Sequence, residues 1–290
     1  MYYLDQLEKA ILYIEENLRE DIKVEDVSSF SGYSYYHFHR VFEAVLGETA
    51  GNYIRNRRMT CAAHDLIYSG RRITDIAVDY QFESLEAFCR AFKKVYKVTP
   101  GTFRKNRIDV IIGNKRELSR SSMKHLESSL SIVPDIRYID DVKLIGIRGK
   151  NSLSDNKLKE LWARFSLIYE HIPNKLNEIR NFGICEVNPE FDLTKFDENT
   201  ESSYFIGTEV SSVKSIPNGM EPKVLKGGKY AVFTHKGGLS TIGMTYDYIW
   251  GTWILCSGQE IDYRDDFELY DYRFIGKSNS GEMDIYIPVR

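Results

Sequence analysis

The sequence lacks the features that mark membrane and secreted proteins. None of its apolar runs approaches the roughly 20 residues that an α-helix needs to cross a bilayer. The opening MYYLDQLEKAILYIEENL has no basic start, no continuous apolar stretch and no small-residue cleavage site, and it predicts a helix rather than a secretion signal. We therefore expect a cytoplasmic protein with no membrane partner.

Metal and cofactor signatures are also missing. The four cysteines, Cys61, Cys89, Cys185 and Cys256, are too widely separated for a disulfide framework or a zinc pattern, and the six histidines add no ligand spacing. No phosphate-binding glycine-rich loop, nucleophile elbow or Ser-His-Asp order is present. The sequence predicts reduced thiols, no metal, no cofactor and no catalytic residues.

The chain has little net charge, but its basic residues are unevenly placed. A formal charge of -3 gives no sign of a nucleic-acid partner. Residues 90–107, however, contain no Asp or Glu, and their density of positive charge suits phosphate contacts. A solvated helix face is the alternative interpretation. The basic residues of this stretch are Arg90, Lys93, Lys94, Lys97, Arg104, Lys105 and Arg107.

An internal repeat occupies the first hundred residues. VEDVSSFSGYS aligns with ITDIAVDYQFES at an offset of 49, and after one inserted residue Phe38 and Phe42 fall on Phe88 and Phe92. Each copy predicts a short helix, a break, and a second helix opened by a serine N-cap, which is the pattern of a helix-turn-helix unit. A continuous helix from residue 53 to residue 67 is expected to join the two units as a rod. The expected exposed faces carry Tyr35, Tyr36, His39 and Arg40 in the first unit, and Leu85, Glu86, Cys89 and Arg90 in the second.

The strings GYSYYHFHRVFEAVLG and ITDIAVDYQFESLEAFCRAFKKVYKVTPGTFRK closely resemble the AraC/XylS family of transcriptional regulators. The resemblance implies that two recognition helices enter successive major-groove segments of double-stranded DNA, and that RNA polymerase is a partner. Arg40 and Arg90 could instead be structural or phosphate-bound. By position, the implied DNA-binding residues are Ser34, Tyr35, Tyr36, His39, Arg40, Ser84, Leu85, Glu86, Arg90, Lys93 and Lys94.

A second repeat follows a Ser-rich stretch, SRSSMKHLESSLSIVPD, that predicts a linker. At an offset of 88, Pro134 matches Pro222 and Trp162 matches Trp250. Each copy predicts a strand (VKLIGIRG or KYAVFTHKG), an amphipathic helix (LKELWARFSLIYEHI or GMTYDYIWGTWILCSG) and two more strands. The outcome is a duplicated β-α-β-β domain with an internal pseudo-twofold axis.

KYAVFTHKGGLSTIGMTYDYIWGTW and DFELYDYRF resemble the GyrI-like effector-binding domain. The resemblance implies a groove that binds a small, often cationic or aromatic molecule against aromatic side chains and one buried glutamate. Glu268 is at the matching position, although a solvent-facing glutamate would show the same strand pattern. The implied effector-binding residues are Glu268, Trp250, Trp162, Tyr230, Phe233 and Tyr204; at least one of the two tryptophans could be a core residue.

These observations predict an α+β protein with an all-α DNA-binding domain (1–107), a linker (108–133) and a GyrI-like domain (134–290). The predicted function is a sequence-specific DNA-binding transcriptional regulator, with activation as the expected mode, that responds to a small-molecule effector. Two alternatives remain: a hydrolase of reactive small molecules fused to a DNA-binding domain, and a ligand sponge that does not couple to DNA.

Overall fold

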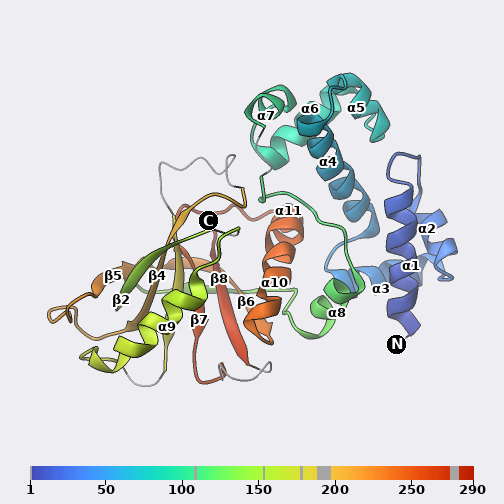
Figure 1. The fold of residues 1–290 in the computed structure, drawn as a ribbon. Helices are drawn as coiled ribbons and strands as arrows, with labels where there is room; N and C mark the ends of the chain where they lie inside the picture. Colours follow the sequence, from blue (N-terminus) through green and yellow to red (C-terminus); the bar gives the residue numbers. More distant parts are fainter. Residues whose placement is uncertain (1, 108–109, 153, 177–178, 188–196, 275–280) are drawn as a thin grey trace. The chain divides into compact units, whose positions relative to one another are not determined.

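The computed structural model describes residues 2–107, 110–152, 154–176, 179–187, 197–274 and 281–290, and the chain forms two compact units (Figure 1). The first is made chiefly of Met1–Ile132 and Gly243–Gly258, and the second of most of the remaining chain. Across the described ranges, no helix combines the length and apolar character that a membrane span requires. The segment 243–258 thus packs with the N-terminal helices, although it lies within the predicted C-terminal domain.

Helices α1 to α7 build the helix-turn-helix part of the first unit, and α2 to α6 are those that the sequence repeat predicts. Helices α2 and α3 form one unit and α5 and α6 form the other, while α4 joins them. The turns contain residues with left-handed backbone, Gly32 at φ +75° in the first unit and Gln81 at φ +60° in the second. The bounds are α1 Tyr2–Glu16, α2 Val24–Phe30, α3 Tyr35–Leu46, α4 Ala50–Tyr68, α5 Ile73–Asp79, α6 Leu85–Tyr96 and α7 Pro100–Asn106.

The repeated phenylalanines fill equivalent places in the two units. Phe38 and Phe42 are fully buried on α3, and Phe42 contacts Tyr53 of α4 with ring centroids 6.0 Å apart. Phe88 and Phe92 are fully buried on α6. Because each side chain contributes about 1.5–3 kcal/mol of transfer free energy on burial, this spacing fixes which face of each second helix points inward.

Only one of the two predicted serine N-caps forms a capping hydrogen bond through its side chain. Ser84 Oγ accepts a hydrogen bond from the Ala87 amide, whereas Ser34 occupies the N-cap position of α3 without such a bond. Thr49 caps α4 in the same way by accepting from the Asn52 amide. The second recognition helix therefore begins with a capping bond that the first lacks.

The predicted linker contains a helix, which corrects the sequence interpretation. Helix α8, Arg120–Ser128, is capped by Ser119 and buries Met123 and Leu126, which are three residues apart. Arg120 donates hydrogen bonds to Asp5 and Glu8 of α1. Serines dominate this segment and only one narrow face of the helix is apolar, so the sequence pattern predicted a linker rather than an amphipathic helix.

The second unit is an eight-stranded sheet in which every paired strand is antiparallel, in the order β1-β6-β8-β7-β3-β4-β2-β5. Reversing the order exchanges equivalent strands of the two halves, so the pseudo-twofold axis passes between β3 and β7. The strands are β1 Asp135–Ile139, β2 Val142–Asn151, β3 Asn181–Glu186, β4 Ser202–Glu209, β5 Glu221–Leu225, β6 Gly228–Lys236, β7 Asp266–Tyr270 and β8 Glu282–Pro288.

The edge strands β1 and β5 are exchanged between the halves, a feature that the predicted β-α-β-β pattern does not contain. β1 begins the first half in sequence but pairs with β6 of the second half, with Asp135 opposite Val232. β5 begins the second half but pairs with β2 of the first, with Pro222 opposite Ile145. Each half therefore contributes one strand to the edge of the other.

The two faces of the sheet bury different side chains. One face holds an aromatic cluster in which Phe267 and Tyr286 stack with centroids 4.3 Å apart. The other face is covered in its first half by helix α9, Leu158–Ile168, which buries Leu161 and Phe165 (Figure 1). Because strand residues alternate between faces, Glu268 lies on the α9 face and its neighbour Phe267 on the other.

The helix predicted at residues 243–258 has an irregular middle. It consists of α10 Ile242–Tyr248, a π-helical stretch Ile249–Trp253 and α11 Ile254–Cys256. π-helical turns are rare and often occur at functional positions. Here the π-helical stretch contains Trp250, Gly251 and Thr252.

Candidate DNA-binding surface and ligand site

Helix α3 presents the side chains that the sequence repeat assigns to DNA. Tyr36 is 83% exposed, Tyr35 is 39% exposed, and Arg40 is exposed one turn further on. His39 is half-buried because its ring lies against Tyr35, with centroids 4.5 Å apart. Tyr35 and His39 therefore pack on each other, and Tyr36 is the most exposed of the aromatic side chains predicted to face DNA on this helix.

Helix α6 carries the equivalent face of the second unit, with Leu85, Glu86 and Arg90 exposed and Lys93 and Lys94 in its last turn. The pKa of the Glu86 carboxyl lies below its usual value because this group accepts hydrogen bonds from its own backbone amide and from Ser84. A carboxylate in a first helical turn also interacts favourably with the helix dipole. Glu86 thus helps to start α6, which is a structural alternative to reading bases.

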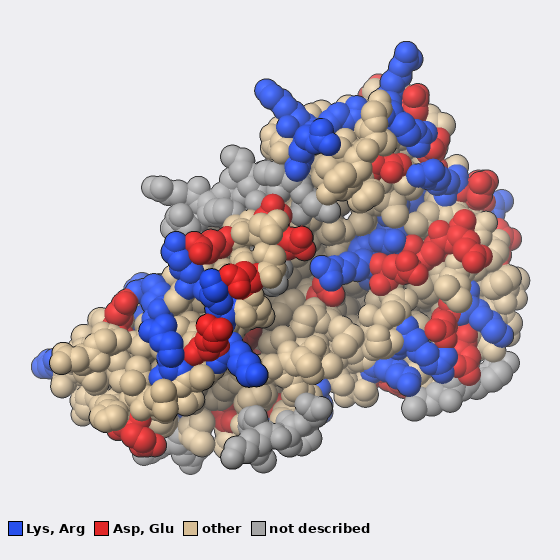
Figure 2. All heavy atoms as spheres, viewed as in Figure 1, with Lys and Arg blue, Asp and Glu red and all other residues tan. Residues whose placement is uncertain are grey.

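Two of the basic residues predicted to contact phosphate have a structural role. Arg104 of α7 donates to the carbonyl oxygens of Leu66 and Arg71, and Arg107 donates to that of Ile67. These bonds satisfy carbonyls near the end of α4 that have no partner within the helix. Figure 2 shows Lys and Arg side chains at the surface at the top of the view, where α5, α6 and α7 lie.

Helix α4 is fixed to α1 by buried charges. Arg57 Nη2 lies 2.7 Å from Glu15 Oε2, and the Arg57 Nε donates to Glu15 Oε1 at 2.8 Å. Tyr53 also donates to Glu15 Oε1, at 2.8 Å. Arg58 donates to the carbonyl oxygens of Leu18 and Glu20 just beyond α1. The connecting helix predicted as a rod is therefore held along its length by side-chain contacts.

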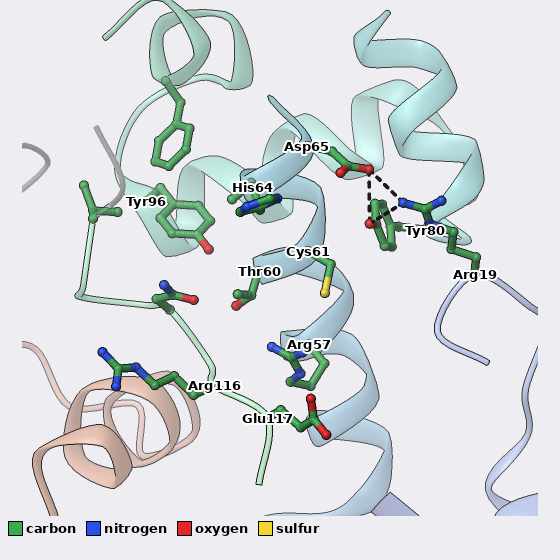
Figure 3. Close-up of a pocket in the computed structure, with 14 residues that line it drawn as sticks. Arg19, Arg57, Thr60, Cys61, His64, Asp65, Tyr80, Tyr96, Arg116 and Glu117 are labelled. Carbon is green, nitrogen blue, oxygen red and sulfur yellow. Dashed lines mark hydrogen bonds and ion pairs between the residues drawn. The ribbon is translucent and has the colours of Figure 1, made fainter. Parts of the chain in front are cut away.

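A second set of contacts joins the end of α1 to the second helix-turn-helix unit beside a cavity of about 510 Å³ (Figure 3). Arg19 Nη2 donates to both Asp65 and the Tyr80 hydroxyl at 3.1 Å, and the Tyr80 hydroxyl donates to Asp65 at 3.2 Å. Figure 3 shows these three side chains meeting at one wall of the cavity. These polar contacts tie the chain just after α1 to α4 and to the second helix-turn-helix unit.

The second compact unit, which contains the eight-stranded sheet, holds the carboxylate that the GyrI-like resemblance predicts. Glu268 on β7 is only 6% exposed, and its Oε2 accepts hydrogen bonds from the hydroxyls of Tyr204, at 2.5 Å, and Tyr270, at 2.9 Å. Burial, together with the nearby Glu268 charge, holds the pKa of Tyr270 well above its usual value. Tyr204 and Tyr270 therefore both donate hydrogen bonds to the Glu268 carboxylate.

An aromatic wall stands next to this carboxylate. Trp162 of α9 contacts Tyr270 edge to face, with ring centroids 4.8 Å apart. Trp162 is half-buried and packs against the cluster that contains Tyr204. A buried carboxylate that accepts hydrogen bonds from two tyrosines, one of which contacts a tryptophan, is an arrangement that attracts cations through both charge and aromatic rings.

A glycine makes this arrangement possible. Gly183 on β3 is paired with Glu268 on β7, and a Cβ at Gly183 would lie 2.9 Å from Glu268 Oε2 and closer still to the Tyr204 hydroxyl. The pseudo-twofold axis runs between these two strands. The second half of the domain therefore contributes the Glu268 carboxylate, and the first half contributes Gly183, whose lack of a side chain leaves room for it.

A second acid shares the face of Glu268. Asp266 lies two residues before it, opposite Cys185 of β3. Burial, the Glu268 charge and the Asp265 charge raise the pKa of Asp266 to about 7. Burial likewise raises the pKa of the Cys185 thiol, which favours its neutral form.

The other predicted effector residues lie in different places. Tyr230 is buried on the opposite face of the sheet, where it contacts Phe267, so the structure does not bring it to Glu268. Phe233 is fully buried and paired with Ile285, on the Glu268 face. Trp250 belongs to the first compact unit.

Strand alternation places Tyr270 on the same face as Glu268, and the structure shows the two side chains hydrogen-bonded. Sequence reasoning missed Gly183 and Asp266, of which Asp266 could have been found by the same alternation. Gly183 could not, since its pairing with Glu268 depends on the strand order. Among the residues that the structure describes, no group of three or more His, Cys, Asp or Glu side chains is arranged to hold a metal ion.

Both parts of the chain match known protein families. Residues 133–290 match the GyrI-like small molecule binding domain, and residues 27–106 match a helix-turn-helix domain. An HTH-type transcriptional regulator YbfP of Bacillus subtilis is 48% identical over 104 residues, which are 36% of this chain and 35% of that protein. The chain thus matches only about a third of that relative's length.

Two further relatives extend the comparison. The transcriptional regulator Rob of Salmonella typhimurium is 27% identical over 237 residues, covering 78% of this chain and 76% of Rob. The HTH-type transcriptional activator AarP of Providencia stuartii is 35% identical over 98 residues, covering 34% of this chain and 73% of AarP. The chain belongs to the GyrI-like small-molecule-binding family and joins that domain to an AraC-type helix-turn-helix domain, the layout of a transcriptional regulator.

Proposed function

We propose that the chain regulates transcription in response to a small aromatic cation that binds at Glu268. The observation that carries the ligand class is the buried Glu268 carboxylate, hydrogen-bonded by two uncharged tyrosine hydroxyls beside Trp162. A cation entering this site gains Coulomb attraction and contact with ring faces. A neutral molecule of the same shape gains only the packing.

The DNA part of the proposal rests on exposure. Tyr36 and Arg40 of α3, and Arg90 of α6, reach solvent from helices whose opposite faces are fixed in cores. Arginine is well suited to a bidentate contact with guanine in the major groove, whereas Lys93 and Lys94 suit phosphates. We assign Tyr36 and Arg40 to base contacts, and the two lysines to orientation of the duplex.

The proposal extends to an activator that positions RNA polymerase, because AarP, a relative of the DNA-binding part, is named a transcriptional activator. The relatives of this chain come from bacteria, in which DNA lies in the cytoplasm. We therefore propose that this chain acts in the cytoplasm. Regulation then requires that ligand binding at one unit change the DNA affinity of the other. By linkage, DNA must change ligand affinity by the same factor.

Fluorescence anisotropy of a labelled duplex tests this coupling. The duplex is selected from a randomised pool by the full chain, and the probes are tetraphenylphosphonium and tetraphenylborate, which have the same shape and opposite charge. The cation is expected to change the DNA dissociation constant by about fivefold or more, the lower range of allosteric coupling, and the anion to leave it unchanged. Equal effects of the two ions would contradict the proposed site, and cation binding without any effect on DNA would favour the ligand sponge.

One observation keeps a hydrolase as a second candidate function. The Tyr204 hydroxyl is 2.5 Å from Glu268 Oε2, an arrangement in which the carboxylate could deprotonate a water that the hydroxyl orients. An assay for turnover of electrophilic aromatic esters separates the two functions. Turnover that falls about 100-fold or more in Glu268→Gln would establish a catalytic role for this residue.

A further inference from the structure

A buried ion pair lies at the end of the first recognition helix. Lys115 is 2% exposed and Glu48 is 3% exposed, and Lys115 Nζ lies 2.5 Å from Glu48 Oε1. Glu48 follows Gly47, the C-cap of α3, by one residue. The Lys115 ammonium also lies 5.2 Å from the centre of the Tyr53 ring. The nearly completely buried Lys115 side chain therefore contacts the turn between α3 and α4.

The main chain of Lys115 is fixed to α4. Its amide donates to Thr60 Oγ1 at 2.9 Å, and its carbonyl oxygen accepts from Arg57 Nη1 at 2.6 Å. Arg57 is itself bonded to Glu15 of α1. A displacement of Lys115 would consequently disturb α1 and α4 together with the end of α3.

The Lys115 side chain has a third partner, Thr252, in the π-helical stretch of residues 243–258. Lys115 Nζ donates to Thr252 Oγ1 at 2.5 Å, and Thr252 is 1% exposed. Beside it, Gly251 lies against the main chain of Asn114, where a Cβ would come within 2.8 Å of the Asn114 carbonyl oxygen. The Gly113 amide donates to the Trp250 carbonyl oxygen at 3.3 Å.

Polar contacts hold the rest of the segment in the first unit as well. His125 Nε2 is 2.8 Å from Thr245 Oγ1, and the Tyr248 hydroxyl donates to the carbonyl oxygen of Ile132 at 2.9 Å. Yet residues 243–258 lie inside the match to the small-molecule-binding family, and the chain continues from them in both directions into the second unit. The residue after the segment, Gln259, is nine positions before Glu268.

We infer that Lys115 is a positioning residue that couples the two functions of the chain, with Thr252 as its contact on the segment 243–258 and Glu48 as its contact at the end of α3. The inference rests on the proposed ligand-responsive function. It identifies the contacts of Lys115 as the path by which ligand binding would affect α3. A buried ion pair is suited to this role because its separation leaves uncompensated charge, so it is either formed or fully broken. Movement of residues 243–258 thereby reaches the recognition helix α3 as a change between two states rather than a gradual shift.

Hydrogen exchange on the full chain tests the route from DNA without any ligand. Binding of the selected duplex is expected to slow amide exchange in residues 243–258 of the wild-type protein. Thr252→Val keeps the shape but removes the hydroxyl, so this response should disappear while the anisotropy measurement shows unchanged DNA affinity. Thr208→Val is the matched control, because Thr208 is equally buried and its hydroxyl donates to the Arg180 carbonyl oxygen within the second unit. A wild-type segment that does not respond to DNA, or a Thr252→Val segment that still does, would overturn the inference.

Tetraphenylphosphonium provides a second arm that separates this inference from the proposed function. Any cation-induced change in DNA affinity should shrink to less than about twofold in Thr252→Val, although calorimetry shows unchanged cation affinity, and should persist in Thr208→Val. A full change retained in Thr252→Val would overturn the route. If the wild type shows no cation-induced change but DNA still slows exchange in residues 243–258, the proposed ligand response fails and the contact through Lys115 stands.

Discussion

Gly183 lies directly opposite Glu268 on the neighbouring strand, and the missing side chain of the glycine provides the space that the Glu268 carboxylate and the Tyr204 hydroxyl occupy. The two residues come from the two halves of a duplicated domain. The candidate ligand site is therefore asymmetric although the strand order around it is twofold.

The first prediction is that Gly183→Ala damages the site. An alanine in a strand interior normally favours folding over glycine by roughly 0.5–1 kcal/mol. Here the added methyl would collide with Tyr204 and Glu268, so we expect a lower melting temperature and loss of cation binding in calorimetry. Gly149→Ala is the control, since the nearest atoms to its methyl would be those of the Leu161 side chain, at 3.0 Å, and not Tyr204 or Glu268. Equal behaviour of the two variants would show that Gly183 has no special role.

The second prediction concerns DNA sequence reading by Arg40. If Arg40 contacts a guanine through both guanidinium nitrogens, Arg40→Ala should weaken binding by about 1–3 kcal/mol and relax the preference at one base position. Lys93→Ala should weaken all sequences alike and reduce the salt dependence, because a phosphate contact carries no sequence information. Selection from a randomised pool with each variant measures both effects. An unchanged pool after Arg40→Ala would remove Arg40 from the recognition set.

The third prediction separates structural arginines from DNA contacts. Arg104→Ala leaves carbonyl oxygens near the end of α4 without partners and should lower the free energy of unfolding by roughly 1–3 kcal/mol. Lys105→Ala, an exposed neighbour, should change stability by less than about 0.5 kcal/mol. Chemical denaturation measures the difference. Equal stability of the two variants would contradict the structural role of Arg104.

Much of this fold could be predicted from the sequence because it depends on local patterns. The phenylalanines four residues apart specified the inner face of α3 and α6, and the alternation around Glu268 specified its strand. Other features depend on contacts between distant residues. Arg104 has the sequence context of a phosphate-binding residue, and only the position of α7 against α4 shows that it bonds to Leu66 and Arg71.

The candidate ligand site shows the same limit. Glu268 could be proposed from its motif, but its hydrogen bond to Tyr204 joins residues 64 positions apart and depends on the order β7-β3-β4. The exchange of β1 and β5 between halves was missed for a related reason. Five-residue edge strands carry little periodicity, and nothing in their sequence specifies which half they join.

The fourth prediction is a pH dependence of cation binding. Since burial, the Glu268 charge and the Asp265 charge raise the pKa of Asp266 to about 7, Asp266 is protonated below this pH and negatively charged above it. Cation affinity should therefore increase as the pH rises from 6 to 8. Stability should change in the opposite direction, because the folded state holds this proton up to pH 7 and the unfolded state only up to about 3.8. Asp266→Asn should abolish the pH dependence in calorimetry, and a wild-type affinity that is constant over this range would contradict it.

The most direct test of the account measures cation affinity in Glu268→Gln. The substitution keeps the shape of the side chain and removes its charge, so it should weaken tetraphenylphosphonium by about 1–3 kcal/mol, the scale of an interaction with a charged group. Triphenylphosphine oxide, a neutral molecule with similar rings, should bind the variant and the wild type nearly alike. Isothermal titration calorimetry with both probes gives the answer. Selective loss of the cation is the predicted result, while equal loss of both probes, or loss of neither, would contradict a ligand site built on the Glu268 charge.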